Sequence, residues 1–152
     1  MALEYSLELS TSMRRTQALE ALAGRVDGLT WGRDGIFLLG STITISASEP
    51  PGIARKVIER GFKFVPTLSI GFRFISNTDY EIFGKIMLQG TMLLLEHAQD
   101  AVLLFNEEII VLQRLGGQLA FNSDYHIWDD DDWLRSRINI PFERRPLPSP
   151  LL

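Results

Sequence analysis

The sequence predicts a two-layer α+β fold, with two main helices packed on one face of a mostly antiparallel sheet. Apolar and polar residues alternate at 3–9, a helical pattern runs over 79–97, and three short apolar runs follow within 101–121. The elements therefore run strand, helix, several strands, long helix and meander. This order is typical of helices gathered on one side of an antiparallel sheet.

The first two elements are a strand and a helix. Residues 3–9 predict a strand because their apolar and polar side chains alternate with a period of two. The hydroxyl residues at 10–12 are candidate N-caps for the helix that follows. Apolar residues recur at helical spacing from Ala18 to Val26, and Gly28 is expected to end this helix.

The next region combines turns with strand-forming residues. A β-hairpin is expected over 29–39, because Asp34-Gly35 favours the positive φ angles of a tight turn. The β-branched residues 42–45 extend this strand region, either as a separate strand or as part of one long bent strand. After the prolines at 50 and 51, residues 53–58 predict one or two amphipathic turns that end at Gly61.

A central strand and a long helix are expected next. Residues 67–75 carry apolar side chains on alternate positions, which predicts a strand inside the sheet. Thr78-x-x-Glu81 is a candidate capping box, in which the two side chains bind free amides at a helix start. The helix should reach about His97, whose partial positive charge suits a helix C-terminus, and should be the main cover of the sheet.

The last third predicts an antiparallel meander and a tail. The apolar runs 101–105, 109–113 and 118–121 are separated by Asn106-Glu107 and by two glycines. No linker or internal repeat marks a second unit, so residues 1–152 are expected to form a single domain. A Pro-rich C-terminal tail, about 141–152, should either dock along the domain or stay mobile.

Composition narrows the function class. The chain has no cysteine, which excludes disulfides, thiolate nucleophiles and cysteine zinc sites and fits a reducing, cytoplasmic location. A net charge of −4 argues against nucleic-acid binding, because that function needs Lys and Arg to neutralise phosphates. The longest apolar windows are too short for a membrane span, and the N-terminus lacks the features of a signal peptide.

The most unusual local feature is a run of four aspartates flanked by two tryptophans. Adjacent carboxylates repel one another, so they are either freely solvated or meet a basic protein surface or a metal. A metal fits poorly, because consecutive aspartates do not converge as alternating ones do. Tryptophan is enriched at interface hot spots, although both tryptophans could simply hold the loop to the core. The candidate protein-binding residues are Asp124, Tyr125, Trp128, Asp129, Asp130, Asp131, Asp132 and Trp133.

No pattern predicts catalysis, a cofactor or a metal. His126 lies beside Asp124 in sequence, but adjacency alone rarely gives the geometry of a catalytic pair. The glycine motifs of phosphate loops, dinucleotide sites and serine hydrolases are missing. We therefore expect a protein that is not an enzyme. Four arginines follow the aspartates, and an intramolecular clamp between the two groups is at least as well supported as an anion site. They are Arg135, Arg137, Arg144 and Arg145.

Three stretches of this chain form a recognisable pattern. They are Phe72-Arg73-Phe74 before Thr78-Asp79-Tyr80, then 100–106, then Leu112-Gln113-Arg114-Leu115-Gly116-Gly117. Their pattern resembles the SitI-type immunity proteins of myxobacteria and other bacteria. These proteins are encoded beside the Sit (swarming inhibition) lipoprotein toxins.

The resemblance implies a cytoplasmic immunity protein that acts in kin discrimination. Its partner would be a cognate, polymorphic Sit-type protein toxin from a sibling cell, which it binds and neutralises. Many such toxins are basic nucleases, so the acidic run could occupy a surface meant for phosphates. The alternatives, both without a toxin partner, are a structural or oligomerising α+β domain, for example a homodimer through an exposed sheet edge, and a small-molecule or metal-binding module.

Overall fold

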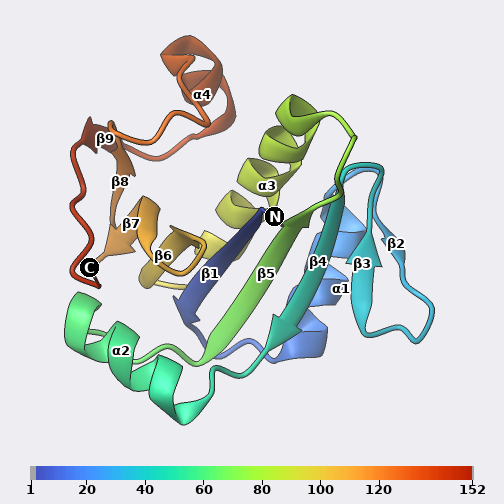
Figure 1. The fold of residues 1–152 in the computed structure, drawn as a ribbon, viewed down its shortest axis with the longest axis horizontal. Helices are drawn as coiled ribbons and strands as arrows, with labels where there is room; N and C mark the ends of the chain where they lie inside the picture. The colour runs from blue at the N-terminus through green and yellow to red at the C-terminus, as the bar shows by residue number, and fades with distance from the viewer. Residues whose placement is uncertain (1–2, 152) are drawn as a thin grey trace.

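One mostly antiparallel sheet organises the protein. The structure, a computed structural model, describes residues 3–151, and that range contains four helices and nine strands. The strands form one sheet in the order β2-β3-β4-β5-β1-β6-β7-β8-β9 (Figure 1). Every pair of neighbours is antiparallel except β8 and β9, which are parallel. The predicted α+β class and the mostly antiparallel sheet are confirmed.

The elements have the following bounds in chain order. The strands are β1 (Glu4–Ser10), β2 (Thr30–Trp31), β3 (Phe37–Leu39), β4 (Ile43–Ser48), β5 (Leu68–Phe74), β6 (Asp100–Phe105), β7 (Ile109–Leu115), β8 (Gln118–Asn122) and β9 (Phe142–Arg145). The helices are α1 (Arg15–Arg25), α2 (Gly52–Phe62), α3 (Tyr80–Leu95) and α4 (Asp131–Arg137). Among the described residues, no helix is both long enough and apolar enough to span a membrane.

The first strand lies in the middle of the sheet. β1 pairs with β5 on one side and with β6 on the other, so its backbone is hydrogen-bonded along both edges. Tyr5, Leu7 and Leu9 point to one face and are almost fully buried. β5, which residues 67–75 predict, lies inside the sheet between β1 and β4.

Both faces of the sheet carry a hydrophobic cluster, because side chains of a strand point alternately to its two sides. The larger cluster contains residues of α1 and α3 together with Leu7 and Leu103. The smaller one joins α2 and the C-terminal tail to Val102 and Leu104 of β6. α2 packs with the second cluster, on the other face of the sheet. The predicted two-layer arrangement, with two main helices on one face, is therefore not confirmed.

Two helices start at other residues than the sequence predicts. α1 begins at Arg15, and the amide of Arg14 donates to Oε1 of Gln17 over 2.8 Å; residues 10–12 lie before the cap. α3 is capped by Asp79, whose Oδ1 accepts from the amides of Glu81 and Ile82. The expected Thr78-x-x-Glu81 capping box is therefore wrong, and the N-cap lies one residue later, because aspartate is at least as good a cap as threonine.

The C-terminus of α3 also has an unexpected partner. The guanidinium of Arg114 on β7 donates to the carbonyl oxygen of Leu95 and, over 3.0 Å, to that of Ala98. The side chain of His97 is exposed, and its carbonyl accepts from Thr11. The C-terminus of α3 therefore binds a cation, as the helix dipole favours, but the cation is Arg114 from β7 and not His97.

The C-terminal segment docks on the sheet. β9 extends it beyond β8, and Leu147 is buried in the smaller cluster. Asn122 at the end of β8 holds this segment, because its Oδ1 accepts from the amide of Leu147 over 3.2 Å. Figure 1 shows the C-terminal end close to α2, and Gly61 of α2 faces Pro150 and Leu151.

Candidate functional site

The predicted acidic segment lies between β8 and β9 and contains the first turn of α4 (Figure 1). Trp128 anchors it: its side chain is only 5% exposed, and its Nε1 donates to the carbonyl oxygen of Gly84 in α3 over 2.9 Å. The ring also packs edge-on against Phe121. Trp128 therefore fixes the segment to the core and is not available as a contact residue.

The other tryptophan has a mixed environment. Trp133 is half-buried on α4, and its ring lies 5.8 Å from Nζ of Lys85 and 5.9 Å from the guanidinium carbon of Arg137. Both distances are within the range of cation–π attraction. Trp133 therefore leaves part of its ring accessible between two cations.

Two of the four aspartates have structural partners. Oδ1 of Asp130 accepts from the amide of Trp133 over 3.0 Å, which caps α4. Oδ1 of Asp131 accepts a hydrogen bond from Nε of Arg144 on β9 over 2.9 Å and forms an ion pair with Nη2 at 2.7 Å. Nη2 of Arg144 also donates to the carbonyl oxygen of Trp128 over 2.7 Å. The arginine clamp is therefore present, and it ties α4 to β9.

The remaining acidic side chains face solvent. Asp129 lies 3.1 Å from Nδ1 of His126, and Asp132 lies 3.7 Å from Arg135; both pairs are exposed. Asp124 is exposed as well. Exposed ion pairs contribute little to stability, so these carboxylates remain available to a partner. No group of three or more metal-ligating side chains occurs in residues 3–151.

Tyr125 belongs to a cluster that the sequence did not predict. The hydroxyl of the buried Tyr5 contacts those of Tyr80 on α3 and Tyr125, the latter at 2.5 Å. Burial, together with these hydroxyl contacts, raises the pKa of Tyr5 far above its ordinary value. Burial also raises the pKa of Tyr125. The three hydroxyls come from distant parts of the chain and hold the start of the acidic segment against β1.

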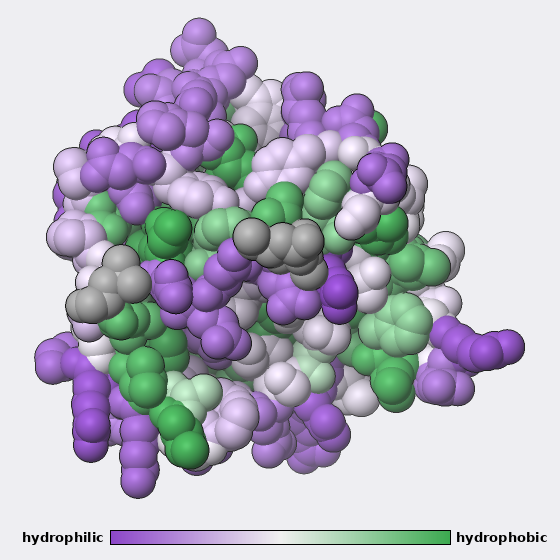
Figure 2. All heavy atoms as spheres, viewed as in Figure 1, coloured by the Kyte–Doolittle hydropathy of each residue, from purple (hydrophilic) through white to green (hydrophobic). Residues whose placement is uncertain are grey.

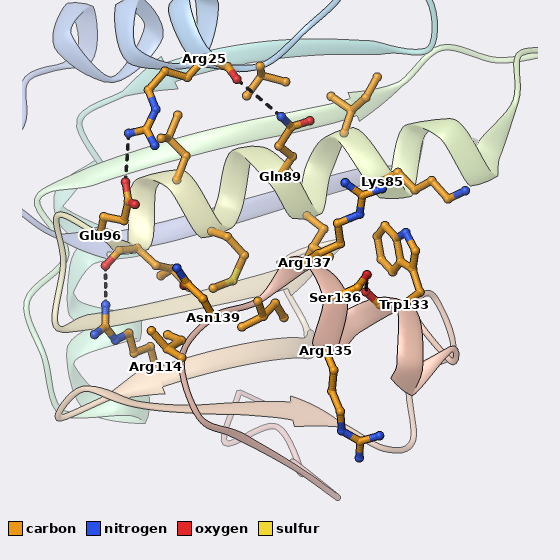
Figure 3. A pocket seen from close by; sticks show the side chains of 18 of the residues that line it. Arg25, Lys85, Gln89, Glu96, Arg114, Trp133, Arg135, Ser136, Arg137 and Asn139 are labelled. Carbon is orange, nitrogen blue, oxygen red and sulfur yellow. Dashed lines mark hydrogen bonds and ion pairs between the residues drawn. The ribbon is translucent and has the colours of Figure 1, made fainter.

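A groove between α3 and the α4 region is the second feature that sequence reasoning missed. It has a volume of about 890 Å³, and one wall is α3 while the other is Trp133 to Ile140 (Figure 3). Ile86 and Met92 contribute apolar surface from α3, and Ile138 and Ile140 do so from the opposite wall. The available signal was that Ile82 and Ile86 extend the apolar pattern of α3 beyond the face that covers the sheet.

The face of the sheet opposite to α1 and α3 is partly open. Figure 2 shows hydrophilic side chains in the middle of this face, over β1 and β5. A second hollow, of about 610 Å³, lies there, with Ser6, Ser46 and Arg73 among its lining residues. Nearby on β1, Glu8 is 9% exposed; Oε1 accepts from Ser69, while Oε2 has no partner. Burial, and to a smaller degree the charge of Glu107, raises the pKa of Glu8 to about 7, against the hydrogen bond from Ser69.

Comparison with known proteins identifies a family that the chain is similar to. A family model described as SitI3-like matches residues 3–132. Neither the curated proteins nor the solved structures contain a significant match. The matched range includes α3 and the aspartates, and it ends just before Trp133.

Proposed function

Because this chain belongs to the SitI3-like family, we propose that it is an immunity protein that binds a cognate protein toxin from sibling cells and neutralises it. The family match over residues 3–132 is the observation that carries this proposal. The protein would act in the cytoplasm by occupying the toxin, without catalysing a reaction. Residues 1–152 would form one immunity-type domain with a C-terminal tail at about 141–152. β9, which lies in this tail, is part of the common sheet and so supports a single domain.

The acidic segment is the proposed toxin-binding surface. Its exposed carboxylates, Asp124, Asp129 and Asp132, would meet basic groups of the toxin. They are carried on a rigid support, because Trp128 is buried and Asp131 is paired with Arg144. A support of this kind lowers the entropy lost when two proteins associate.

The remaining predicted residues would act in support of these contacts. Asp130 caps α4 and Tyr125 holds the start of the segment, so both position the carboxylates. Trp133 would contribute the accessible part of its ring at the edge of the surface.

The function is tested with the product of the adjacent open reading frame, which the family resemblance identifies as the candidate toxin. We expect a stoichiometric complex in light scattering and protection of cells that express both proteins. If the two proteins do not associate, and co-expression does not restore growth, the proposed function is wrong.

The surface is tested with the double variant Asp129→Asn/Asp132→Asn, which leaves the cap and the Arg144 clamp intact. The matched control is Asp27→Asn/Asp34→Asn, which removes the same charge at exposed positions elsewhere. We expect the association rate at low salt to fall about tenfold for the first pair only, because charged surfaces steer encounter. Equal rates for both pairs would remove the acidic segment from the interface.

A second candidate function is self-association through the β2 edge of the sheet. β2 has a free edge, and the hairpin that carries it exposes Trp31 at 44% and Ile36 at 67%. Exposed apolar side chains at a sheet edge favour pairing with a second copy. Light scattering of the isolated protein distinguishes a homodimer from a monomer.

A further inference from the structure

The groove between α3 and α4 differs in charge from the rest of the protein. The whole chain has a net charge of −4, yet five of the groove's lining residues are cationic and one is acidic. The cations are Arg25, Lys85, Arg114, Arg135 and Arg137, and the acidic residue is Glu96. A local excess of positive charge in an acidic protein favours a negatively charged occupant.

Most of these cations already have ion-pair or hydrogen-bond partners, so only part of the positive charge is available to an occupant. Arg25 is paired with Glu96 at 3.1 Å, and Arg114 binds the carbonyls at the end of α3. Lys85 is paired with Glu81 at 3.4 Å, and Arg135 is paired with Asp132 at 3.7 Å. Arg137 has no acidic partner within 4 Å among the described residues, and its guanidinium lies over the ring of Trp133. Figure 3 shows Arg137 and Lys85 directed toward the same end of the groove.

The inside of the groove is apolar. Ile82 is 44% exposed, Ile86 and Met92 are partly buried, and all three lie along α3. Asn139 of the second wall is a polar lining residue that could bind a backbone, whereas Gln89 of α3 is directed toward Arg25 in Figure 3 and donates to its carbonyl oxygen. An occupant would therefore need apolar side chains for the interior as well as negative charge for the rim.

The two walls have different relations to the family. α3 lies inside the matched range 3–132, whereas the wall from Trp133 to Ile140 lies after it. This second wall is nevertheless well anchored, because Ile138 is buried in the main cluster and Arg144 ties β9 to Asp131. The groove therefore combines one wall that lies inside the matched range with one wall that lies after it.

We propose that this groove receives an acidic segment of the toxin that carries apolar anchor residues, and that residues 133–140 determine which toxin is accepted. The inference rests on the proposed function. The chain's own tail is not the occupant, because Leu147 and Leu151 pack with α2 in the smaller cluster. α4 thus offers carboxylates at its first turn and Arg137 at its last, so a partner with opposite charges in the same order fits along it.

The charge at the rim is tested by Arg137→Glu, with Arg33→Glu on the exposed β2–β3 hairpin as the matched control. With the adjacent gene product as the probe, we expect the dissociation constant to rise about tenfold or more for Arg137→Glu and to stay unchanged for the control. Thermal melting of each variant separates loss of binding from loss of folding.

The identity of the occupant is tested by placing a photo-cross-linking amino acid at position 139. We expect a cross-link to a toxin peptide rich in Asp and Glu. A cross-link to a basic or uncharged toxin segment, a cross-link to a second copy of this chain, or no cross-link would overturn the inference. Unchanged binding of Arg137→Glu would do so as well.

Failure of the two proposals is distinguishable. If the wild-type protein does not bind the adjacent gene product, the proposed immunity function fails. If the wild-type protein binds and Arg137→Glu binds equally well, the function stands and the groove is not the docking site.

Discussion

Glu8 should make the stability of this protein fall as the pH rises toward neutrality. Its carboxyl lies on β1, 9% exposed, with Ser69 as the hydrogen-bond donor to one oxygen and no partner for the other. Removing the carboxylate from water disfavours the charged form, so the pKa rises from 4.5 to about 7.

The sign of the effect follows from proton binding. Between pH 4.5 and 7 the native protein keeps the proton on Glu8, whereas the unfolded chain has lost it. The unfolded state then binds fewer protons, so the free energy of unfolding decreases as the pH rises through this interval. At about 1.4 kcal/mol for each pKa unit, the burial of Glu8 costs about 3 kcal/mol at pH 8 and about 1 kcal/mol at pH 5.

Glu8→Gln removes the ionisation while keeping the shape and the acceptor for Ser69. We expect this variant to exceed the wild type in unfolding free energy by about 3 kcal/mol at pH 8, and by about 1 kcal/mol at pH 5. Urea denaturation at both pH values measures the difference. Glu4→Gln, on the same strand and face but exposed and paired with Arg73, is the matched control and should show no such pH dependence.

Two results would refute this reasoning. A Glu8→Gln variant with the same pH dependence as the wild type would show that the carboxyl is not desolvated. A variant that is less stable than the wild type at pH 8 would show that the ionised carboxylate has a stabilising partner, in contrast to the unpaired Oε2.

Three further predictions concern stability. Trp128→Phe removes the hydrogen bond to Gly84 and leaves a void, so urea denaturation should show a loss of about 2–3 kcal/mol; an unchanged midpoint would contradict the anchoring role. Asn122→Ala removes the bonds to Leu147, so stability should fall by about 2–4 kcal/mol and limited proteolysis should cleave the tail faster, whereas an equally resistant tail would argue against this role. Gly24→Ala in α1 should increase the free energy of unfolding by about 0.5 kcal/mol and so raise the melting temperature slightly, because alanine favours a helix and its Cβ would meet no atom within 4 Å. A lower melting temperature would indicate an unrecognised contact.

Periodicity allowed most of the sheet to be predicted. Alternation identified β1 and β5, and turn residues with positive φ, such as Asn106 and Gly117, separate the strands of the meander as expected. The start of α3 was misplaced by one residue, since Thr78 and Asp79 are both acceptable caps and only the folded geometry selects between them.

The acidic segment shows where sequence reasoning about a site stops. Its unusual charge was evident, and the arginine clamp was one of the expected alternatives. Four neighbouring aspartates nevertheless have different roles, because the backbone turns Asp130 toward the helix amides and Asp131 toward Arg144 while Asp129 and Asp132 face solvent. Residue type predicted a charged surface, but not which aspartates have structural partners and which face solvent.

Sequence alone determined the α+β class, the interior strand β5 and the long helix α3, because local spacing of apolar residues records which side of each element is buried. Only the tertiary structure decided that α2 packs with the second cluster, that three tyrosine hydroxyls meet, and that α3 and residues 133–140 enclose a groove. The physical reason is that these features join segments far apart in the chain, and no local pattern specifies which distant surface a buried side chain will contact.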